Sequence, residues 1–271
     1  MIEMAYKVFG QGQPIVVIHG LYGMSDNWLP FAKRMQSQYR VYLVDVRNHG
    51  LSPHSETHTY EDICSDISLF LKNHNIEKAI LMGHSMGGKA AMLFALQNSE
   101  RVSSLIIVDI APVNYQSQMY DSQIYNHSDI IKAMLKLEVG KIKNRTEAEV
   151  LLNQRVGDIR TTRFLLKNLV KAKEGYKWRL NLKTLQSSLI NIIGGFELKN
   201  LVPVTLYPVL AIKGSNSNFI TREGEEAILK YFPLAKIVTI EDAGHWLHAE
   251  KPDEFFEAVN TFLKNCLINH T

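Results

Sequence analysis

The 271-residue sequence has little cysteine, little net charge and no long apolar run. Its two cysteines, Cys64 and Cys266, have no metal-ligand spacing and imply no disulfide framework, so we expect two buried or partly buried thiols. No run of about 18 apolar residues occurs and the start, MIEMAYKVFG, has no apolar stretch of signal length, which indicates a cytoplasmic protein without membrane insertion. A net charge of +3 is too small to indicate nucleic acid as a partner.

The charge is unevenly distributed along the chain. Residues 112–199 contain 15 Lys and Arg against 8 Asp and Glu, a net of +7, whereas the remainder contains 15 against 19, a net of −4. The two parts of the chain therefore differ in the sign of their net charge. We predict that 112–199 is an insertion in a domain formed by 1–111 and 200–271.

Short apolar runs bounded by turn residues recur in both flanking parts, at residues 15–18, 41–44, 79–82, 105–108, 209–212 and 236–240. Each is too short for a helix and too continuously apolar for a half-exposed strand, which is typical of a parallel sheet covered on both faces. Helical segments lie between the runs, one of them opened by a capping box of Thr59 and Asp62 and another by Pro252 at a first turn. This alternation predicts a mostly parallel, doubly wound α/β fold.

The middle of the chain breaks the alternation. Four segments between residues 128 and 193, SDIIKAMLKLEV, TEAEVLLNQRV, TRFLLKNLVKA and NLKTLQSSLINII, carry helical spacing with no strand run among them. We expect an inserted helical cap.

The stretch AILMGHSMGG places Ser85 between Gly83 and Gly87, where a predicted strand turns sharply into a predicted helix. Glycine suits both positions because the turn is strained and neighbouring backbone must pass close to it. Such a turn exposes the serine hydroxyl and directs the N-terminus of the helix at a developing anion. The same pattern in isolation also occurs as a simple tight turn. The strand-turn-helix context favours Ser85 as a nucleophile.

The stretch IVVIHGLYG ends another predicted strand with His19 and Gly20. A bend at this glycine lets the N–H of Leu21 face the same cavity as the N–H of Met86, which would give two donors for an oxyanion. We interpret His19 as structural rather than as a base.

The general base should be a histidine after the last strand. KIVTIEDAGHWLHAEKP supplies His245 there, beside Trp246, whose indole can pack near the imidazole. His248 is a competitor one helical turn further on, which we expect to face the cap or solvent. A purely structural histidine at this strand end is the alternative.

Together, GHSMGG, HGLYG, DVRNHGLSP and AGHWLHAEKP resemble the α/β-hydrolase superfamily. DVRNHGLSP, GHSMGGKA and VDIAPVNY are more similar still to the small YbfF-type bacterial esterases and their mitochondrial abhydrolase relatives. The resemblance implies an α/β-hydrolase fold and a cofactor-free hydrolase with a Ser-His-acid triad. Asp45 and Arg47 match a strand-end motif of that family, and we interpret them as structural.

The resemblance makes one loop unusual. Most superfamily members carry the acid three residues after a glycine on the loop that follows the penultimate strand, and counting from Gly214 that position is Ser217. A serine cannot stabilise an imidazolium. The neighbouring Asn216 could orient an imidazole but brings no charge. The carboxylates near this loop are poorly placed substitutes; they are Glu223, Glu241 and Asp242.

Asp109 is the better candidate for the acid. It ends the run at 105–108, and in the superfamily order this strand is next to the one that delivers Ser85 and two positions from the last strand. The YbfF-type esterases are thought to hold their acid here. The alternative is an aspartate that only caps the turn before Ala-Pro.

These residues predict a mechanism and a substrate class. Ser85 attacks an acyl carbon, His245 acts as base, Asp109 orients the imidazole, and the acyl-enzyme is hydrolysed by water. The expected substrate is a small acyl ester or a thioester such as an acyl-CoA, with no metal and no cofactor. Two alternatives stay open at this point, a cofactor-free haloperoxidase or perhydrolase on the same triad and a non-catalytic ligand-binding protein. The sequence carries no signal for an oligomeric state.

Overall fold

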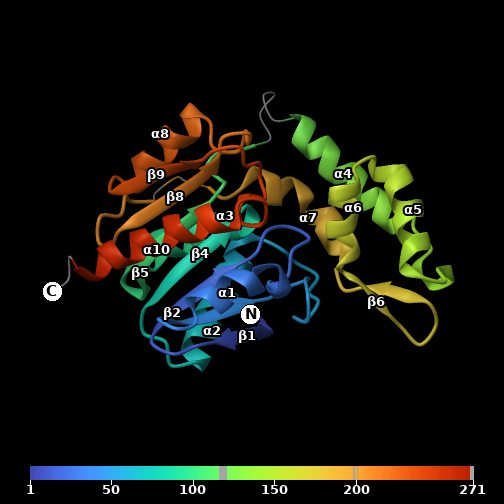
Figure 1. The fold of residues 1–271 in the computed structure, drawn as a ribbon, viewed down its shortest axis with the longest axis horizontal. Coiled ribbons are helices and arrows are strands. Elements are labelled where there is room, and N and C mark those ends of the chain that lie inside the picture. The colour runs from blue at the N-terminus through green and yellow to red at the C-terminus, as the bar shows by residue number, and fades with distance from the viewer. Residues whose placement is uncertain (116–120, 198, 200, 269–271) are drawn as a thin grey trace.

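A computed structural model describes residues 1–115, 121–197, 199 and 201–268, with the side chains of 121–126, 267 and 268 left aside. A seven-stranded sheet with the order β1-β3-β2-β4-β5-β8-β9 forms its centre (Figure 1). The strands are β1 Tyr6–Phe9, β2 Gln13–Ile18, β3 Tyr39–Val44, β4 Ala79–His84, β5 Val102–Val108, β8 Val209–Gly214 and β9 Ala235–Ile240. All neighbours pair in parallel except β1, which is antiparallel to β3. The six predicted runs are therefore strands of a mostly parallel sheet.

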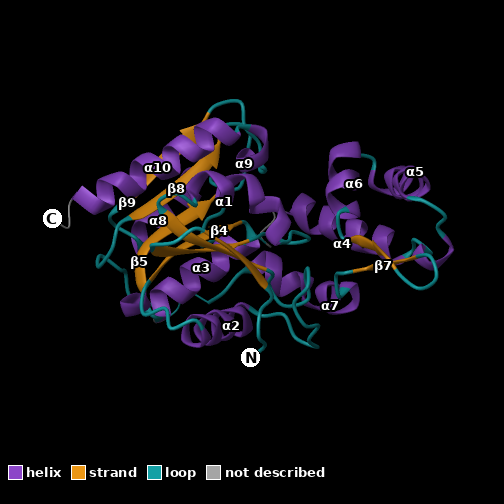
Figure 2. Ribbon diagram, turned by 60° about the horizontal axis from the view of Figure 1, so that its bottom comes forward, coloured by secondary structure: helices purple, strands orange, loops and turns teal. Residues whose placement is uncertain are grey.

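Helices pack on both faces of this sheet (Figure 2). They are α1 Leu29–Met35, α2 Tyr60–Asn73, α3 Met86–Gln97, α8 Arg222–Tyr231, α9 Leu247–Glu250 and α10 Pro252–Ile268. Successive side chains of a strand point to opposite faces, so Ile15 and Val17 of β2 join the apolar cluster with α1 and α10, and Val16 and Ile18 join the cluster with α2 and α3. Continuous apolar runs are stable here because both faces are covered.

The predicted helix starts are confirmed at α2 and α10. Thr59 Oγ1 accepts a hydrogen bond from the Asp62 N–H at 3.1 Å, and the Asp62 carboxylate accepts one from the Thr59 N–H at 3.3 Å. Pro252 is the first residue of α10. The capping box provides acceptors for free N–H groups at the N-terminus of α2, and the proline at the start of α10 has no N–H group to satisfy.

A group of elements is inserted between β5 and β8 and lies to one side of the sheet (Figure 1). They are α4 Asp121–Leu135, α5 Arg145–Val156, α6 Ile159–Leu166, β6 Leu169–Lys171, β7 Tyr176–Trp178 and α7 Leu182–Gly194. We call this group the cap. The expectation of helices without a strand was wrong, because β6 and β7 form a short antiparallel hairpin. The division into core and cap at residues 112 and 199 stays a prediction.

Candidate active site

Ser85 stands at the junction between β4 and α3, as the GHSMGG stretch predicted. Its φ of 53° and ψ of −121° are sparsely populated for any residue with a side chain, a strain of about 1–3 kcal/mol that such serine turns hold. A Cβ on Gly83 would lie 2.2 Å from the Gly87 carbonyl oxygen, and one on Gly87 would lie 2.3 Å from the Ile18 carbonyl oxygen. Glycine is therefore required at both positions. Ser85 opens on a small cavity of about 30 Å³.

The structure brings Asp109 and His245 together. His245 Nδ1 lies 2.7 Å from Asp109 Oδ2, and the aspartate side chain is completely buried. Asp109 directly follows β5 with a φ of 49°, and its N–H donates to the Ile212 carbonyl of β8 at 2.8 Å. β5 is next to β4 and separated from β9 by β8 alone. This is the arrangement from which Asp109 was predicted as the acid.

Ser217 contacts the same carboxylate, which its sequence position did not reveal. Its hydroxyl donates to Asp109 Oδ2 at 2.5 Å, and the Gly214 N–H donates to Asp109 Oδ1 at 3.2 Å. Both bonds fix the direction of the carboxylate toward His245. The loop that holds the acid in most of the superfamily thus supplies two donors to an acid on the neighbouring strand.

The other candidates for the acid show no hydrogen bond or ion pair with His245 among the described residues. Glu241, Asp242 and Glu223 are exposed, and the main-chain N–H of Asp242 is bonded to Ser215 Oγ at 2.8 Å. The Asn216 main chain is tied to the Ala243 carbonyl at 2.9 Å. Within the described residues, Asp109 is the carboxylate in contact with His245.

Aromatic and histidine rings enclose His245. Its imidazole stacks on Phe219 with ring centroids 3.9 Å apart, and its carbonyl accepts a hydrogen bond from His84 Nε2 at 2.8 Å. Trp246 contacts Phe164 of the cap at 5.3 Å between centroids, so the loop after β9 reaches the cap. Among the described residues, Ser85 Oγ makes no hydrogen bond with the imidazole. Such pairs often shorten only when substrate binds.

His248 is partly exposed and lies near Lys167 of the cap, as expected, but its ring also packs on the core. Its ring stacks on Trp28 with centroids 4.1 Å apart and an interplanar angle of 11°, and it also contacts His84 and Phe255. Burial, then the nearby charge of His245, lowers the pKa of His248 to about 3. A histidine held neutral in this position packs against the core.

The two residues predicted to form an oxyanion hole, Leu21 and Met86, line the same cavity as Ser85. Gly20 allows this approach, because a Cβ there would lie 3.1 Å from Ser85 Cβ. His19 is fixed in one neutral tautomer, since its Nδ1 donates to the Gly20 carbonyl at 2.8 Å and its Nε2 accepts from the Val46 N–H at 3.0 Å. These bonds give His19 a structural place beside the bend.

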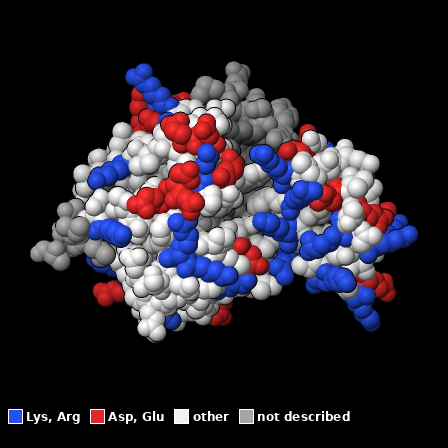
Figure 3. Space-filling model, viewed as in Figure 1, with Lys and Arg blue, Asp and Glu red and all other residues white. Residues whose placement is uncertain are grey.

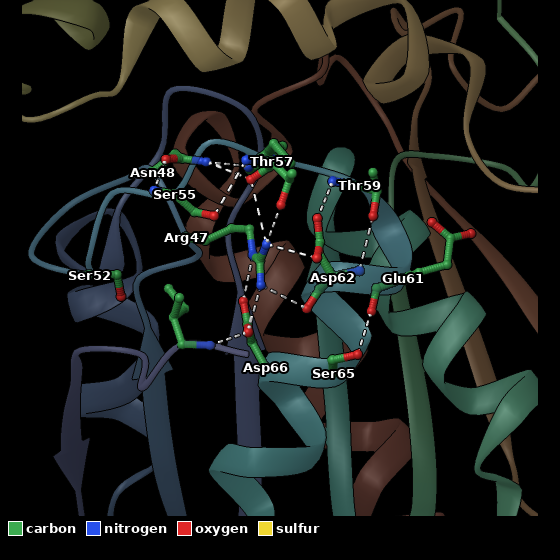
Figure 4. Close-up of polar contacts among 12 residues, drawn as sticks. Arg47, Asn48, Ser52, Ser55, Thr57, Thr59, Glu61, Asp62, Ser65 and Asp66 are labelled. Carbon is green, nitrogen blue, oxygen red and sulfur yellow. Dashed lines mark hydrogen bonds and ion pairs between the residues drawn. The ribbon is translucent and has the colours of Figure 1, made fainter.

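Arg47 joins the strand-end loop to α2 (Figure 4). Its guanidinium contacts both oxygens of Asp66, at 2.7 and 2.8 Å, and one oxygen of Asp62, at 3.0 Å. Asp45 accepts the N–H groups of Ser25 and Leu51 at 2.6 and 2.8 Å. Both charged residues are buried and bonded inside the scaffold, away from His245.

Two basic residues of the cavity wall were missed by the sequence analysis, Lys89 of α3 and His127 of α4. Lys89 is 2% exposed, and it is the one charged residue in the helix MGGKAAMLFALQ. A charge in an otherwise apolar helix was the available signal. His127 belongs to the cap, where residues 112–199 gave no motif to select it.

Within the described ranges, no three His, Cys, Asp or Glu side chains are grouped to hold a metal ion. No helix in the same ranges is both long enough and apolar enough to cross a bilayer.

The fold, the serine turn and the buried Asp-His pair define the class of protein. The sequence model of the alpha/beta hydrolase fold family matches residues 13–252, and the chain belongs to this family. It is an α/β hydrolase of the esterase/lipase type, as the resemblance predicted.

The relatives agree with this class. The chain is 33% identical to "Esterase YbfF" of Escherichia coli, over 93% of each chain. It is 36% identical to "sn-1-specific diacylglycerol lipase ABHD11" of Danio rerio, over 97% of this chain and 83% of the relative. A solved structure named "Marine microorganism esterase" superposes with a TM-score of 0.91 at 37% identity, covering 97% of this chain and all of the other. The predicted YbfF-type relationship is confirmed.

Proposed function

We propose that the protein hydrolyses acyl esters through a Ser85-His245-Asp109 triad and a covalent acyl-enzyme. The observation that carries the proposal is the 2.7 Å contact between His245 Nδ1 and the buried carboxylate of Asp109, one strand away from the Ser85 turn. A carboxylate there holds Nδ1 protonated, which leaves Nε2 free to accept the serine proton.

The reaction follows the usual order for such a triad. Ser85 Oγ attacks the acyl carbon while His245 takes its proton, and the N–H groups of Leu21 and Met86 stabilise the oxyanion. His245 then protonates the leaving alcohol or thiol. Water, activated by the same imidazole, releases the acid and restores Ser85.

Thioesters are the second substrate class that we propose. Residues 112–199 carry a net charge of +7, and Lys and Arg side chains are spread over the cap on the face shown in Figure 3. A positive surface beside the site would attract an anionic acyl donor such as an acyl-CoA. The relatives named esterase and diacylglycerol lipase support hydrolysis of oxygen esters.

The test is Ser85→Ala, assayed with p-nitrophenyl butyrate. We expect less than about a thousandth of the wild-type kcat, because only oxyanion stabilisation and binding are left. A fluorophosphonate should add one covalent label to the wild type, at Ser85 by mass spectrometry, and none to the variant. Ser103→Ala, which removes a hydroxyl near the start of β5, is the matched control. An active Ser85→Ala protein with normal thermal unfolding would contradict the proposal.

A further inference from the structure

Lys89 is a buried cation without a carboxylate partner among the described residues. Its Nζ donates to two main-chain carbonyls, that of Val113 at 3.0 Å and that of Ile193 at 2.9 Å. Val113 lies in the segment between β5 and α4, and Ile193 lies in the last turn of α7, so Lys89 joins α3 to both ends of the insertion. Burial without a nearby anion among the described residues lowers the pKa of Lys89 to about 7, so the amine is partly neutral near pH 7 and an anionic ligand beside it would favour the ammonium form.

An ammonium has three N–H donors, and two carbonyls use only two of them. The remaining described contact of Nζ is the face of the Tyr115 ring, 4.5 Å away. A cation–π contact of this kind is weaker than a charge-assisted hydrogen bond to an anion. Lys89 therefore has the capacity to bind one oxygen acceptor.

That acceptor would lie in the cavity of Ser85, because Lys89 lines the same wall. Residues four apart on a helix lie on one face, about 5–6 Å apart at Cβ, and helical side chains tilt toward the N-terminus. Lys89 follows Ser85 by four residues, so its stem runs back toward the nucleophile. A short acyl chain on Ser85 would reach Nζ.

The other polar groups of the wall are less suited to an anion. Tyr60 OH donates to the Ile192 carbonyl at 2.6 Å, and Tyr115 OH donates to the Phe219 carbonyl at 2.5 Å. Burial, then the charge of His245, lowers the pKa of His127 to about 4, so its ring is neutral near pH 7. Lys89 is thus the cation that this wall offers.

We infer that Lys89 forms the far end of the acyl site and selects short acyl groups that end in a carboxylate, as in half-esters of a four-carbon dicarboxylic acid. The inference rests on the proposed role of Ser85 as the nucleophile. A terminal carboxylate would give the buried ammonium the counter-ion that the described residues do not provide.

The experiment compares three methyl esters of similar shape by their release of methanol. Monomethyl succinate carries the carboxylate, methyl succinamate replaces it by a neutral amide, and methyl 4-methylpentanoate replaces it by an apolar group. We expect the wild type to show a kcat/KM at least ten times higher for the half-ester than for either neutral ester. This comparison needs no variant.

Two substitutions then test the residue. Lys89→Met removes the charge and all hydrogen-bond donors. Lys89→Gln removes the charge but keeps two N–H groups that can donate to the Val113 and Ile193 carbonyls. Both should lower the ratio of half-ester to neutral-ester kcat/KM at least tenfold. The ratio depends on the charge of Lys89 and not on its hydrogen bonds to the main-chain carbonyls. Lys132→Gln, at an exposed cap lysine, is the control and should keep the wild-type ratio.

The outcomes separate this inference from the proposed function. Turnover of the neutral esters without preference for the half-ester would overturn the inference alone. A preference that persists in both Lys89 variants would overturn it too. Loss of turnover on all esters in the wild type would instead contradict the proposed function.

Discussion

Several histidines around the candidate site are held neutral by burial. Burial lowers the pKa of His58 and His248 to about 3 and that of His127 to about 4. The pKa values of His49 and His84 are also well below the usual value, first because of burial and then because of neighbouring histidines. In the unfolded chain each would take up a proton near pH 6.5.

Acidification should therefore destabilise the protein. Below pH 6.5 the unfolded state binds more protons than the folded state, so the free energy of unfolding falls as the pH falls toward each folded-state pKa. Each such histidine should contribute a loss of about 2 kcal/mol between pH 7 and pH 5. Urea unfolding of the wild type and of His248→Phe at both pH values measures this.

The variant should lose about 2 kcal/mol less than the wild type over this range. Phenylalanine preserves the stacking on Trp28 and has no proton to take up, and His248 Nδ1 has no hydrogen-bond partner to lose among the described residues. Parallel losses in the two proteins would show that His248 does not titrate on unfolding.

The residues of the site differ in how far the sequence could predict them. Ser85 and His245 follow from motifs that need a particular turn, and Asp109 follows from strand order, which places distant residues together. The bond from Ser217 to Asp109 could not be predicted, because it depends on side-chain direction across two loops. Lys89 could be noticed only as a charge in an apolar helix, because its partners are main-chain carbonyls that the sequence does not reveal.

The elements of the core were easier to predict than those of the cap. Five strands are apolar runs that are largely buried, whereas the two edge strands, β1 and β9, mix exposed and half-buried residues. The run KNLVKA was taken as the end of a helix, but α6 stops at Leu166 and β6 begins at Leu169. Three-residue strands depend on their pairing partner, so local periodicity does not identify them.

The close packing of the turn between β4 and α3 can be tested by changing one of its glycines. Gly83→Ala would place a Cβ 2.2 Å from the Gly87 carbonyl oxygen and force β4 and α3 apart. We expect a loss of about 1–3 kcal/mol in unfolding free energy and at least a tenfold lower kcat, because Ser85 moves with the turn.

Gly140→Ala is the matched control, since an added Cβ there has no atom within 4 Å. It should change neither stability nor kcat appreciably. A Gly83→Ala protein with wild-type kcat on p-nitrophenyl butyrate would show that the close packing of the turn is unimportant for catalysis.

At the scale of the molecule, a slightly acidic core carries a basic cap. The residues outside 112–199 have a net charge of −4 and those inside a net of +7. Part of the cap charge is neutralised locally, because Lys132, Lys141 and Arg163 form ion pairs with acidic residues of the cap. The remaining charge can act on a ligand only through a field that salt screens.

If that field attracts acyl-CoA, kcat/KM for butyryl-CoA should fall steeply between about 10 and 500 mM salt. The kcat/KM for p-nitrophenyl butyrate, a neutral ester of the same acyl group, should change little. Stopped-flow or steady-state rates over a salt series measure both. Equal salt responses would remove the argument from cap charge and leave ester hydrolysis untouched.

The central claim is that Asp109 is the acid of the triad. The decisive measurement is kcat on p-nitrophenyl butyrate for Asp109→Asn and for Asp109→Asn/Ser217→Asp, with thermal unfolding to check the fold. The single variant should lose about four orders of magnitude, because an amide favours the wrong imidazole tautomer.

The double variant tests the position as well as the charge. Ser217 Oγ lies 2.5 Å from the Asp109 oxygen that contacts His245, so an aspartate at 217 would bring a carboxylate to the same imidazole. We expect it to recover ten- to a thousand-fold over Asp109→Asn, about 1 to 4 kcal/mol in barrier. An Asp109→Asn protein with near wild-type kcat would contradict the claim and place the acid elsewhere.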